Sequence, residues 1–211
     1  MKNIVILGAG ELGKETVWLI EDINRIRPSW LILGFLDDTK EKGDVCHGYP
    51  VLGSMEDLDK VKEEIPVYAV IALQNGMDRN RIANKYDTST KWATIIHPTA
   101  VLAPDVIVGD GSIVFPQVTV SVSSILGAHN LLYINATVCN DCFFEECVSV
   151  MTGATISEHV KVGKESYISA GSTIYPKINI GRKVKIAVDA TVENDIKDSV
   201  EFGKKGKGLF F

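Results

Sequence analysis

The chain has 211 residues, of which 45% are hydrophobic, and it carries a formal net charge of −5 at pH 7. This apolar content indicates a buried core, with room for one large domain or two small ones. The acidic balance argues against nucleic acid or an anionic membrane as the main partner, because both require a basic surface. No run of about 18 apolar residues and no signal-peptide layout occurs, so we expect a cytoplasmic protein with a small-molecule partner.

Residues 1–92 have the pattern of a Rossmann-like α/β domain that binds a nucleotide or a sugar. An apolar strand over 4–7 enters a glycine-rich turn, and helical spacing follows over 14–23. Further strands are predicted over 31–35 and 67–73, and ligands of open parallel sheets bind at the carboxyl ends of the strands. The candidate substrate-binding residues therefore follow the three strands: Gly8, Gly10, Glu11, Leu12, Gly13, Asp37, Asp38, Gln74, Asn75 and Arg79.

The glycine turn fits a dinucleotide fingerprint, in which backbone amides at a helix N-terminus approach a phosphate. A nicotinamide cofactor would need two mononucleotide halves and a substrate domain, and only about ninety residues precede the next architecture. We therefore favour a mononucleotide or nucleotide sugar. A purely structural role, in which the glycines allow close packing of the helix on the sheet, stays open.

A repeat of six residues decides the fold of residues 93–196. Every sixth residue is apolar in a column of sixteen positions: Leu102, Val108, Val114, Val120, Leu126, Leu132, Val138, Phe144, Val150, Ile156, Val162, Ile168, Ile174, Ile180, Ile186 and Val192. A second column, two residues before the first, is mostly small or β-branched. Neither a helix nor a single strand can hold this spacing, so we predict a left-handed parallel β-helix with hexapeptide repeats and a separate C-terminal tail over 197–211.

The hexapeptide repeat, the segment Gly8-Ala9-Gly10-Glu11-Leu12-Gly13-Lys14 and the segments at 35–38 and 95–98 resemble the sugar O-acyltransferase family that contains NeuD and PglD. The resemblance spans nearly the whole chain. It implies a homotrimer that transfers an acetyl group from acetyl-CoA to an amino or hydroxyl group of a nucleotide-linked sugar or sialic acid for surface glycans. It also implies that acetyl-CoA lies along the β-helix between subunits, near Gly153, Ala170, Gly171 and Pro176.

The family uses a histidine as general base, and Asn140 occupies that position here. The neighbours agree with the family, because Asn135 matches a family asparagine and Asp141 matches the carboxylate that orients the histidine. The usual C-terminal Gly-x-Pro-Ala segment is also replaced, by the glycines and lysines of 203–208. An asparagine cannot accept a proton at neutral pH. Either another side chain serves as the base, with Glu158 a weaker candidate than the histidine that follows it, or an amine acceptor binds unprotonated and needs no protein base.

Asp141 and His159 are 18 residues apart, which places them in register on adjacent coils about 4.8 Å apart. Our hypothesis is that His159, polarised by Asp141, replaces the lost base; an exposed histidine without such a role is the alternative. We expect His129, on another face, at a solvated rim. The spacing of Cys139 and Cys142 is typical of zinc, but the latter falls in the inward column, so we predict no metal site.

Two functions remain open from the sequence. The first is an acetyl-CoA-dependent sugar N- or O-acetyltransferase, and we favour it. The second is a catalytically silent trimer that binds a nucleotide sugar or acts as a scaffold, because Asn140 and the altered tail depart from the family. Binding of acetyl-CoA distinguishes the two.

Overall fold

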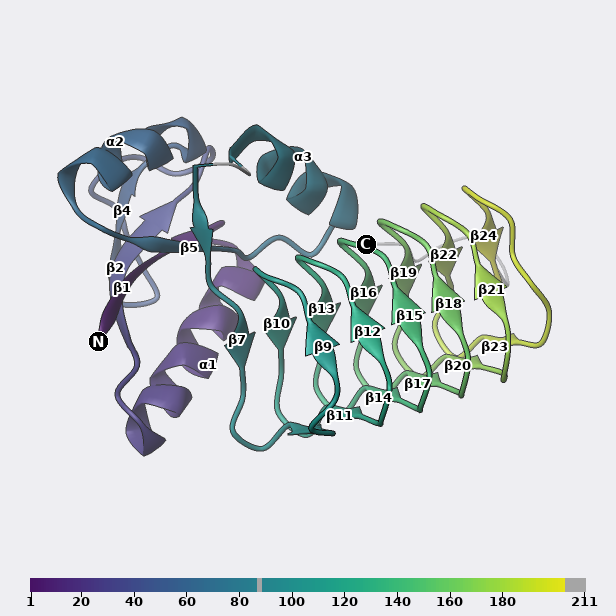
Figure 1. Ribbon diagram of the computed structural model, residues 1–211. Helices are drawn as coiled ribbons and strands as arrows, with labels where there is room; N and C mark the ends of the chain where they lie inside the picture. Colours follow the sequence, from purple (N-terminus) through teal and green to yellow (C-terminus); the bar gives the residue numbers. More distant parts are fainter. Residues whose placement is uncertain (87–88, 204–211) are drawn as a thin grey trace.

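The computed structural model describes residues 1–86 and 89–203, and two architectures follow one another along the chain (Figure 1). The N-terminal part alternates strands and helices, as its hydrophobic pattern predicts. Its elements are β1 (Lys2–Leu7), α1 (Glu11–Ile26), β2 (Trp30–Leu36), β3 (Val45–Cys46), β4 (Tyr49–Gly53), the short helix η1 (Met55–Asp57), α2 (Leu58–Glu64), β5 (Tyr68–Ile71), α3 (Gly76–Tyr86) and β6 (Lys91–Trp92).

These strands form one sheet in the order β3-β4-β2-β1-β5-β6, parallel except for the β3–β4 pair. The central strand β1 pairs with β2 on one side and β5 on the other, so the carboxyl ends of all three strands share one edge. The sheet confirms the predicted α/β class. The hairpin of β3 and β4 and the helix α2 were not predicted, because their short segments carry little periodicity.

The rest of the chain is a parallel β-helix of two-residue strands, which confirms the predicted hexapeptide fold. Sheet C holds β7 (Ile95–Ile96), β10 (Ile113–Val114), β13 (Leu131–Leu132), β16 (Ser149–Val150), β19 (Tyr167–Ile168), β22 (Lys185–Ile186) and β24 (Glu201–Phe202). Sheet D holds β8 (Val101–Leu102), β11 (Thr119–Val120), β14 (Thr137–Val138), β17 (Thr155–Ile156), β20 (Thr173–Ile174) and β23 (Thr191–Val192). Sheet E holds β9 (Ile107–Val108), β12 (Ile125–Leu126), β15 (Phe143–Phe144), β18 (Lys161–Val162) and β21 (Asn179–Ile180).

Residues 18 apart are direct cross-strand partners, as in the pairs Phe144 with Val162 and Val150 with Ile168. From Val114 onward, the predicted apolar column is buried in the prism interior. From Gly111 to Asp189, each corner contains one residue with a left-handed backbone, such as Asp141 at φ 58° and His159 at φ 59°. The strand β24 continues sheet C to Phe202, past the predicted end of the β-helix at residue 196.

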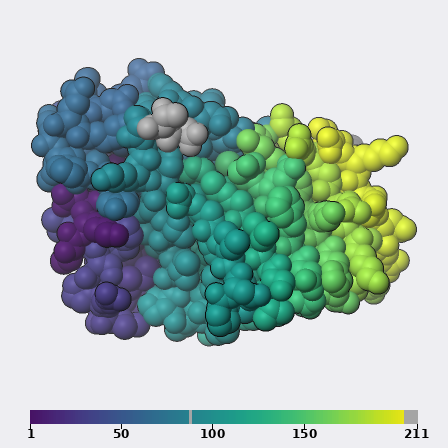
Figure 2. All heavy atoms as spheres, viewed as in Figure 1, coloured from purple at the N-terminus to yellow at the C-terminus, as the bar shows by residue number. Residues whose placement is uncertain are grey.

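The N-terminal domain lies on the first coils of the β-helix (Figures 1 and 2). Side chains of β1 and α1, including Ile4 and Leu19, share one apolar core with Ile95 and Ile113 of sheet C. A second core fills the opposite side of the N-terminal sheet, beneath α2 and α3. Within the residues described, no helix is both long and apolar enough to cross a membrane.

Candidate functional site

The glycine turn between β1 and α1 has two glycines that the packing requires. Gly8 has φ 108°, and a Cβ on it would lie 2.8 Å from the carbonyl oxygen of Ala72. A Cβ on Gly13 would overlap the carbonyl oxygen of Gly8, so only glycine lets α1 approach the strand this closely. Gly10 differs, because a Cβ there would meet no atom within 4 Å. Packing therefore explains Gly8 and Gly13, whereas Gly10 leaves the start of α1 open to a ligand.

Asp37 lies beside this turn, as predicted from its place after β2. Its Oδ2 accepts a hydrogen bond from the backbone amide of Ala9 at 2.7 Å, and its Oδ1 accepts two from Thr39. Burial by itself would raise the pKa of Asp37, but these hydrogen bonds outweigh it and lower the pKa. Asp38 instead accepts a hydrogen bond from the amide of Met55 at 2.9 Å. Asp37 thus shapes the turn, and Asp38 holds the start of η1.

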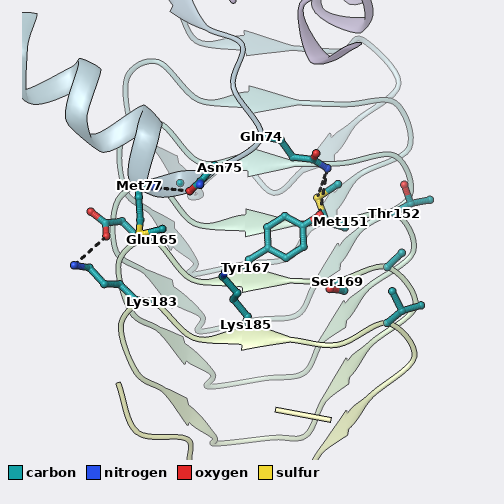
Figure 3. Close-up of a pocket in the computed structure, with 13 residues that line it drawn as sticks. Gln74, Asn75, Met77, Met151, Thr152, Glu165, Tyr167, Ser169, Lys183 and Lys185 are labelled. Atoms are coloured by element: carbon teal, nitrogen blue, oxygen red, sulfur yellow. Dashed lines mark hydrogen bonds and ion pairs between the residues drawn. The ribbon is translucent and has the colours of Figure 1, made fainter. Parts of the chain in front are cut away.

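A cleft of about 480 Å³ lies between the loop after β5 and sheet C. In Figure 3 the Tyr167 ring occupies its centre, Gln74 lies above it and Lys185 below it. The cleft combines polar side chains with apolar ones, which is typical of small-molecule sites of this size. Its lining residues are Gln74, Asn75, Gly76, Met77, Met151, Thr152, Glu165, Tyr167, Ser169, Ala170, Lys183, Lys185 and Val188.

Arg79 does not face this cleft, although it follows β5 as a predicted substrate-binding residue. Its side chain is fully buried between α3 and the β-helix, where its Nε donates to the carbonyl oxygen of His129 at 2.9 Å. Its Nη2 donates to the carbonyl of Cys147 and the hydroxyl of Ser149, both at 2.9 Å. Burial lowers the pKa of Arg79 to about 10. The structure therefore gives Arg79 a role in joining the two domains.

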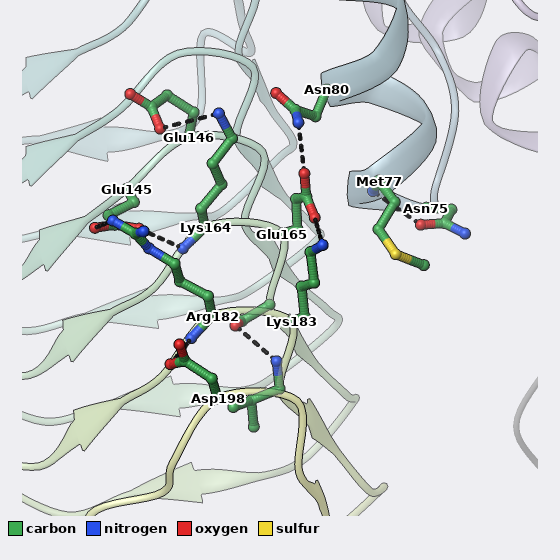
Figure 4. A network of polar contacts seen from close by, with 12 residues as sticks. Asn75, Met77, Asn80, Glu145, Glu146, Lys164, Glu165, Arg182, Lys183 and Asp198 are labelled. Atoms are coloured by element: carbon green, nitrogen blue, oxygen red, sulfur yellow. Dashed lines mark hydrogen bonds and ion pairs between the residues drawn. The ribbon is translucent and has the colours of Figure 1, made fainter.

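A network of charged side chains forms one rim of the cleft (Figure 4). The Glu165 carboxylate is only 6% exposed and lies 3.7 Å from Lys183 Nζ. It also accepts a hydrogen bond from Asn80 of α3 at 2.5 Å. Nearby, the guanidinium of Arg182 donates two hydrogen bonds to Glu145, at 2.8 and 2.9 Å. These pairs hold α3 and three successive coils in a fixed relation along the cleft.

Asn140, Asp141 and His159 lie at the corner between sheets D and E, opposite sheet C. His159 Nδ1 is 3.9 Å from Asp141 Oδ2, so the two residues meet across adjacent coils in the predicted register. Asn140 Nδ2 donates a hydrogen bond to the same Asp141 oxygen at 2.5 Å. Both His159 and Asp141 are exposed, with 51% and 42% of their side chains accessible. This corner lies outside the cleft of its own chain.

The residues expected to contact acetyl-CoA occupy two corners of the prism. Gly153, Ala170 and Gly171 lie between sheets C and D, and Ala170 also lines the cleft. Pro176 lies at the corner between sheets D and E, and Asn135 lies at the corner between sheets C and D. Sheet D thus separates the two groups.

His129 and Cys142 are both buried in the structure. His129 is 5% exposed, and its ring packs edge-on against Trp92 with 4.8 Å between the ring centroids. The prediction that His129 lies at a solvated rim was therefore wrong. The N-terminal domain covers this corner, which the β-helix pattern alone does not reveal. Cys142 is buried, as its column predicts, and burial raises the pKa of its thiol to about 11. The described residues contain no group of three or more His, Cys, Asp or Glu side chains placed to hold a metal.

Comparison with known proteins agrees with this architecture. Residues 3–86 match the family model of the PglD N-terminal domain. Over 168 residues the chain is 28% identical to the GDP-perosamine N-acetyltransferase of Escherichia coli O157:H7, covering 79% of this chain and 75% of that protein. The chain is thus similar to PglD over its N-terminal domain and to a sugar N-acetyltransferase over most of its length.

Solved structures extend the similarity over both domains. The acetyltransferase domain of PglB from Neisseria gonorrhoeae FA1090, in complex with acetyl coenzyme A, is 29% identical, with a TM-score of 0.84 and 94% of each chain covered. PerB from Caulobacter crescentus, in complex with CoA and GDP-perosamine, shares the fold at 22% identity. Its TM-score is 0.86, and the match covers 94% of this chain and 92% of that one.

Several cleft residues were not predicted, and most of them lie on sheet C or in the turns next to it. Tyr167 and Lys185 stand at outward positions of the repeat, which the hexapeptide pattern assigns to solvent or a partner without choosing between them. Met151 and Met77 come from segments 74 positions apart in the chain and meet only after the domains pack. The sequence held one signal for Tyr167 as a cleft residue. It is an aromatic residue at an outward position that Ser149 and Lys185 occupy on the adjoining coils.

Proposed function

We propose that this chain transfers an acetyl group from acetyl-CoA to an amino group of a nucleotide-linked sugar. The observation that carries the proposal is the 480 Å³ cleft between a nucleotide-binding type of domain and the β-helix. The relatives support the proposed activity, because the Escherichia coli relative is a GDP-perosamine N-acetyltransferase and the gonococcal domain binds acetyl coenzyme A. The catalytically silent alternative has no comparable support. A cytoplasmic location fits a reaction that consumes acetyl-CoA.

The reaction needs one base and a well-placed nucleophile. The amine nitrogen attacks the thioester carbonyl carbon, and the tetrahedral intermediate then expels the CoA thiolate. The nitrogen loses one proton to the base, and the thiolate takes up one proton to leave as CoA thiol. Holding the amine and the thioester together supplies much of the acceleration, because the reaction becomes effectively intramolecular.

His159 is our candidate for the base. Asn140 cannot accept the proton, whereas an imidazole within 3.9 Å of a carboxylate is suited to general base catalysis near neutral pH. Asp141, 3.9 Å from the imidazole, then orients His159. Asn140, which donates to the same carboxylate, holds Asp141 in place.

A homotrimer would join the two halves of this site. In one chain the cleft lies on sheet C and His159 lies on the opposite corner, so they can meet only between two copies. Sheet D separates the proposed acetyl-CoA residues Gly153, Ala170 and Gly171 from Pro176. Packing of sheet D against a neighbour would therefore form a groove for the coenzyme between subunits.

We test the function by calorimetry with acetyl-CoA and a panel of GDP- and UDP-linked amino sugars, followed by a transferase assay. We expect acetyl-CoA to bind and one sugar to be acetylated on nitrogen. A protein that binds a nucleotide sugar but not acetyl-CoA would instead support the silent alternative.

The base is tested by His159→Asn, for which we expect kcat to fall by about 10²- to 10⁴-fold with little change in KM. His47→Asn is the matched control, because His47 is exposed in the N-terminal domain, far from the corner. Unchanged turnover in the His159 variant would remove this residue from the mechanism and would leave the substrate amine to bind already deprotonated.

A further inference from the structure

Tyr167 presents a phenol at the centre of the cleft. It stands on the outer face of β19 in sheet C, in register with Ser149 on one side and Lys185 on the other. Ser149 is covered by the N-terminal domain, whereas Lys185 is exposed. Tyr167 thus lies at the boundary where the cover of the N-terminal domain ends, and its ring is half-buried (Figure 3).

The direction of the phenolic hydrogen follows from the partner of the hydroxyl. Gln74 Nε2 donates to the Tyr167 oxygen at 3.2 Å, so this contact uses the oxygen as an acceptor. A phenol has one hydrogen to donate, and no acceptor for it is found among residues 1–86 and 89–203. Burial raises the pKa of Tyr167, so the hydroxyl keeps its hydrogen at neutral pH. The phenol is therefore a donor available to a ligand in the cleft.

Gln74 is itself held in position by the join between the domains. Its backbone carbonyl accepts a hydrogen bond from Arg79 Nη1 at 2.8 Å and another from the Ser149 hydroxyl at 3.2 Å. The Gln74 side chain therefore starts from a fixed point above the Tyr167 ring. Its amide group also contacts the sulfur of Met151 at 3.9 Å, which leaves the NH₂ group, and not the carbonyl, facing the phenol.

We propose that Tyr167 donates its phenolic hydrogen to a hydroxyl oxygen of the acceptor sugar and that Gln74 is the positioning residue that directs this hydrogen into the cleft. The proposal rests on the proposed function and names the group of the substrate that the cleft would recognise, a hydroxyl of the acceptor sugar. The surrounding side chains fit a sugar ring, which has polar edges and apolar C–H faces. Met77, Met151 and Val188 supply the apolar contacts beside the phenol.

The first test is Tyr167→Phe, measured with GDP-perosamine and then with UDP-linked amino sugars. We expect the KM and the calorimetric Kd for the sugar to rise about five- to tenfold, with kcat and the KM for acetyl-CoA unchanged. Tyr68→Phe is the matched control, because it removes a phenol that packs on Trp30 outside the cleft. An unchanged sugar Kd in Tyr167→Phe would overturn the assignment.

The second test separates the direction of the hydrogen bond from simple packing. In Gln74→Glu a carboxylate replaces the donor and takes the phenolic hydrogen, so we expect the same loss of sugar affinity as in Tyr167→Phe. The double variant should then lose no more than either single variant. Gln74→Met removes the donor that directs the phenolic hydrogen but takes no hydrogen from it, so its loss of sugar affinity should lie between those of the wild type and Tyr167→Phe. Additive losses in the double variant would show that the new charge acts independently of Tyr167 and would overturn the role of Gln74.

The outcomes also separate this proposal from the proposed function. If the wild-type protein acetylates a nucleotide sugar and Tyr167→Phe has the wild-type Kd, only the assignment of Tyr167 fails. If the wild-type protein binds neither acetyl-CoA nor any nucleotide sugar, the proposed function fails, and the assignment fails with it.

Discussion

Asp37 shows how one carboxylate can shape a binding loop. Its two oxygens accept hydrogen bonds from the backbone of the glycine turn and from Thr39, and the side chain is almost fully covered. A charge in this position would be costly if it were unpaired, but hydrogen bonds to the ionised form offset the cost. The carboxylate therefore stabilises the fold and the shape of the turn through the same contacts.

We predict that this contribution depends on pH. The pKa of Asp37 is lower in the folded protein than in the unfolded chain, where it is about 3.9, so its stabilisation is complete above that value. The stabilisation is lost as the pH falls through the folded pKa. In urea unfolding, Asp37→Asn should therefore have a lower free energy of unfolding than the wild type at pH 7. The difference between the two free energies should shrink below about pH 4. A difference that stays constant down to pH 2 would contradict this account.

At the scale of elements, Arg79 is the buried side chain that joins α3 to the β-helix. Arg79 donates to carbonyl groups on both sides of the contact and has no carboxylate within its set of partners among the described residues. Gly76 at the start of α3 allows the close approach, because a Cβ there would overlap the carbonyl oxygen of Cys147. The helix and two coils of sheet C thus pack as one unit.

We predict that Arg79→Ala lowers the free energy of unfolding by about 3 kcal/mol or more, because several buried carbonyl oxygens lose their donor. Arg79→Lys should recover only part of this, since an ammonium group cannot reproduce the planar set of donors. Arg81→Ala is the control, because 67% of that side chain is exposed, and it should change the stability by less than about 0.5 kcal/mol. Urea midpoints measure all three, and a wild-type midpoint for Arg79→Ala would contradict the prediction.

At the scale of the whole molecule, two faces of the β-helix could carry a subunit contact. Sheet D presents a column of threonines, Thr119, Thr137, Thr155, Thr173 and Thr191, between the two corners that hold the proposed acetyl-CoA residues. Sheet E presents Ile107, Ile125 and Phe143 in register and exposed, followed by Lys161 and Asn179. We propose a contact through sheet D, because this sheet lies between the corner next to the cleft and the His159 corner.

We therefore predict that Thr155→Arg converts a trimer to monomers in sedimentation velocity, because a charge would be buried without a partner. Asn179→Arg, on the exposed part of sheet E, is the matched control and should stay trimeric. If Phe143→Arg dissociates the protein and Thr155→Arg does not, sheet E carries the contact instead. A wild-type protein that sediments as a monomer would refute the shared site.

The amino-acid sequence specified the register of the β-helix, because a period of six places one residue of each strand in the interior whatever surrounds it. It also located the glycine turn with Asp37 beside it, since consecutive strands of a parallel sheet share their carboxyl edge. It could not determine which outward side chains are covered. Cys147 and Ser149 are buried, and Tyr167 lines a cleft, only because α3 packs across sheet C. That packing joins residues more than sixty positions apart, which no local period records.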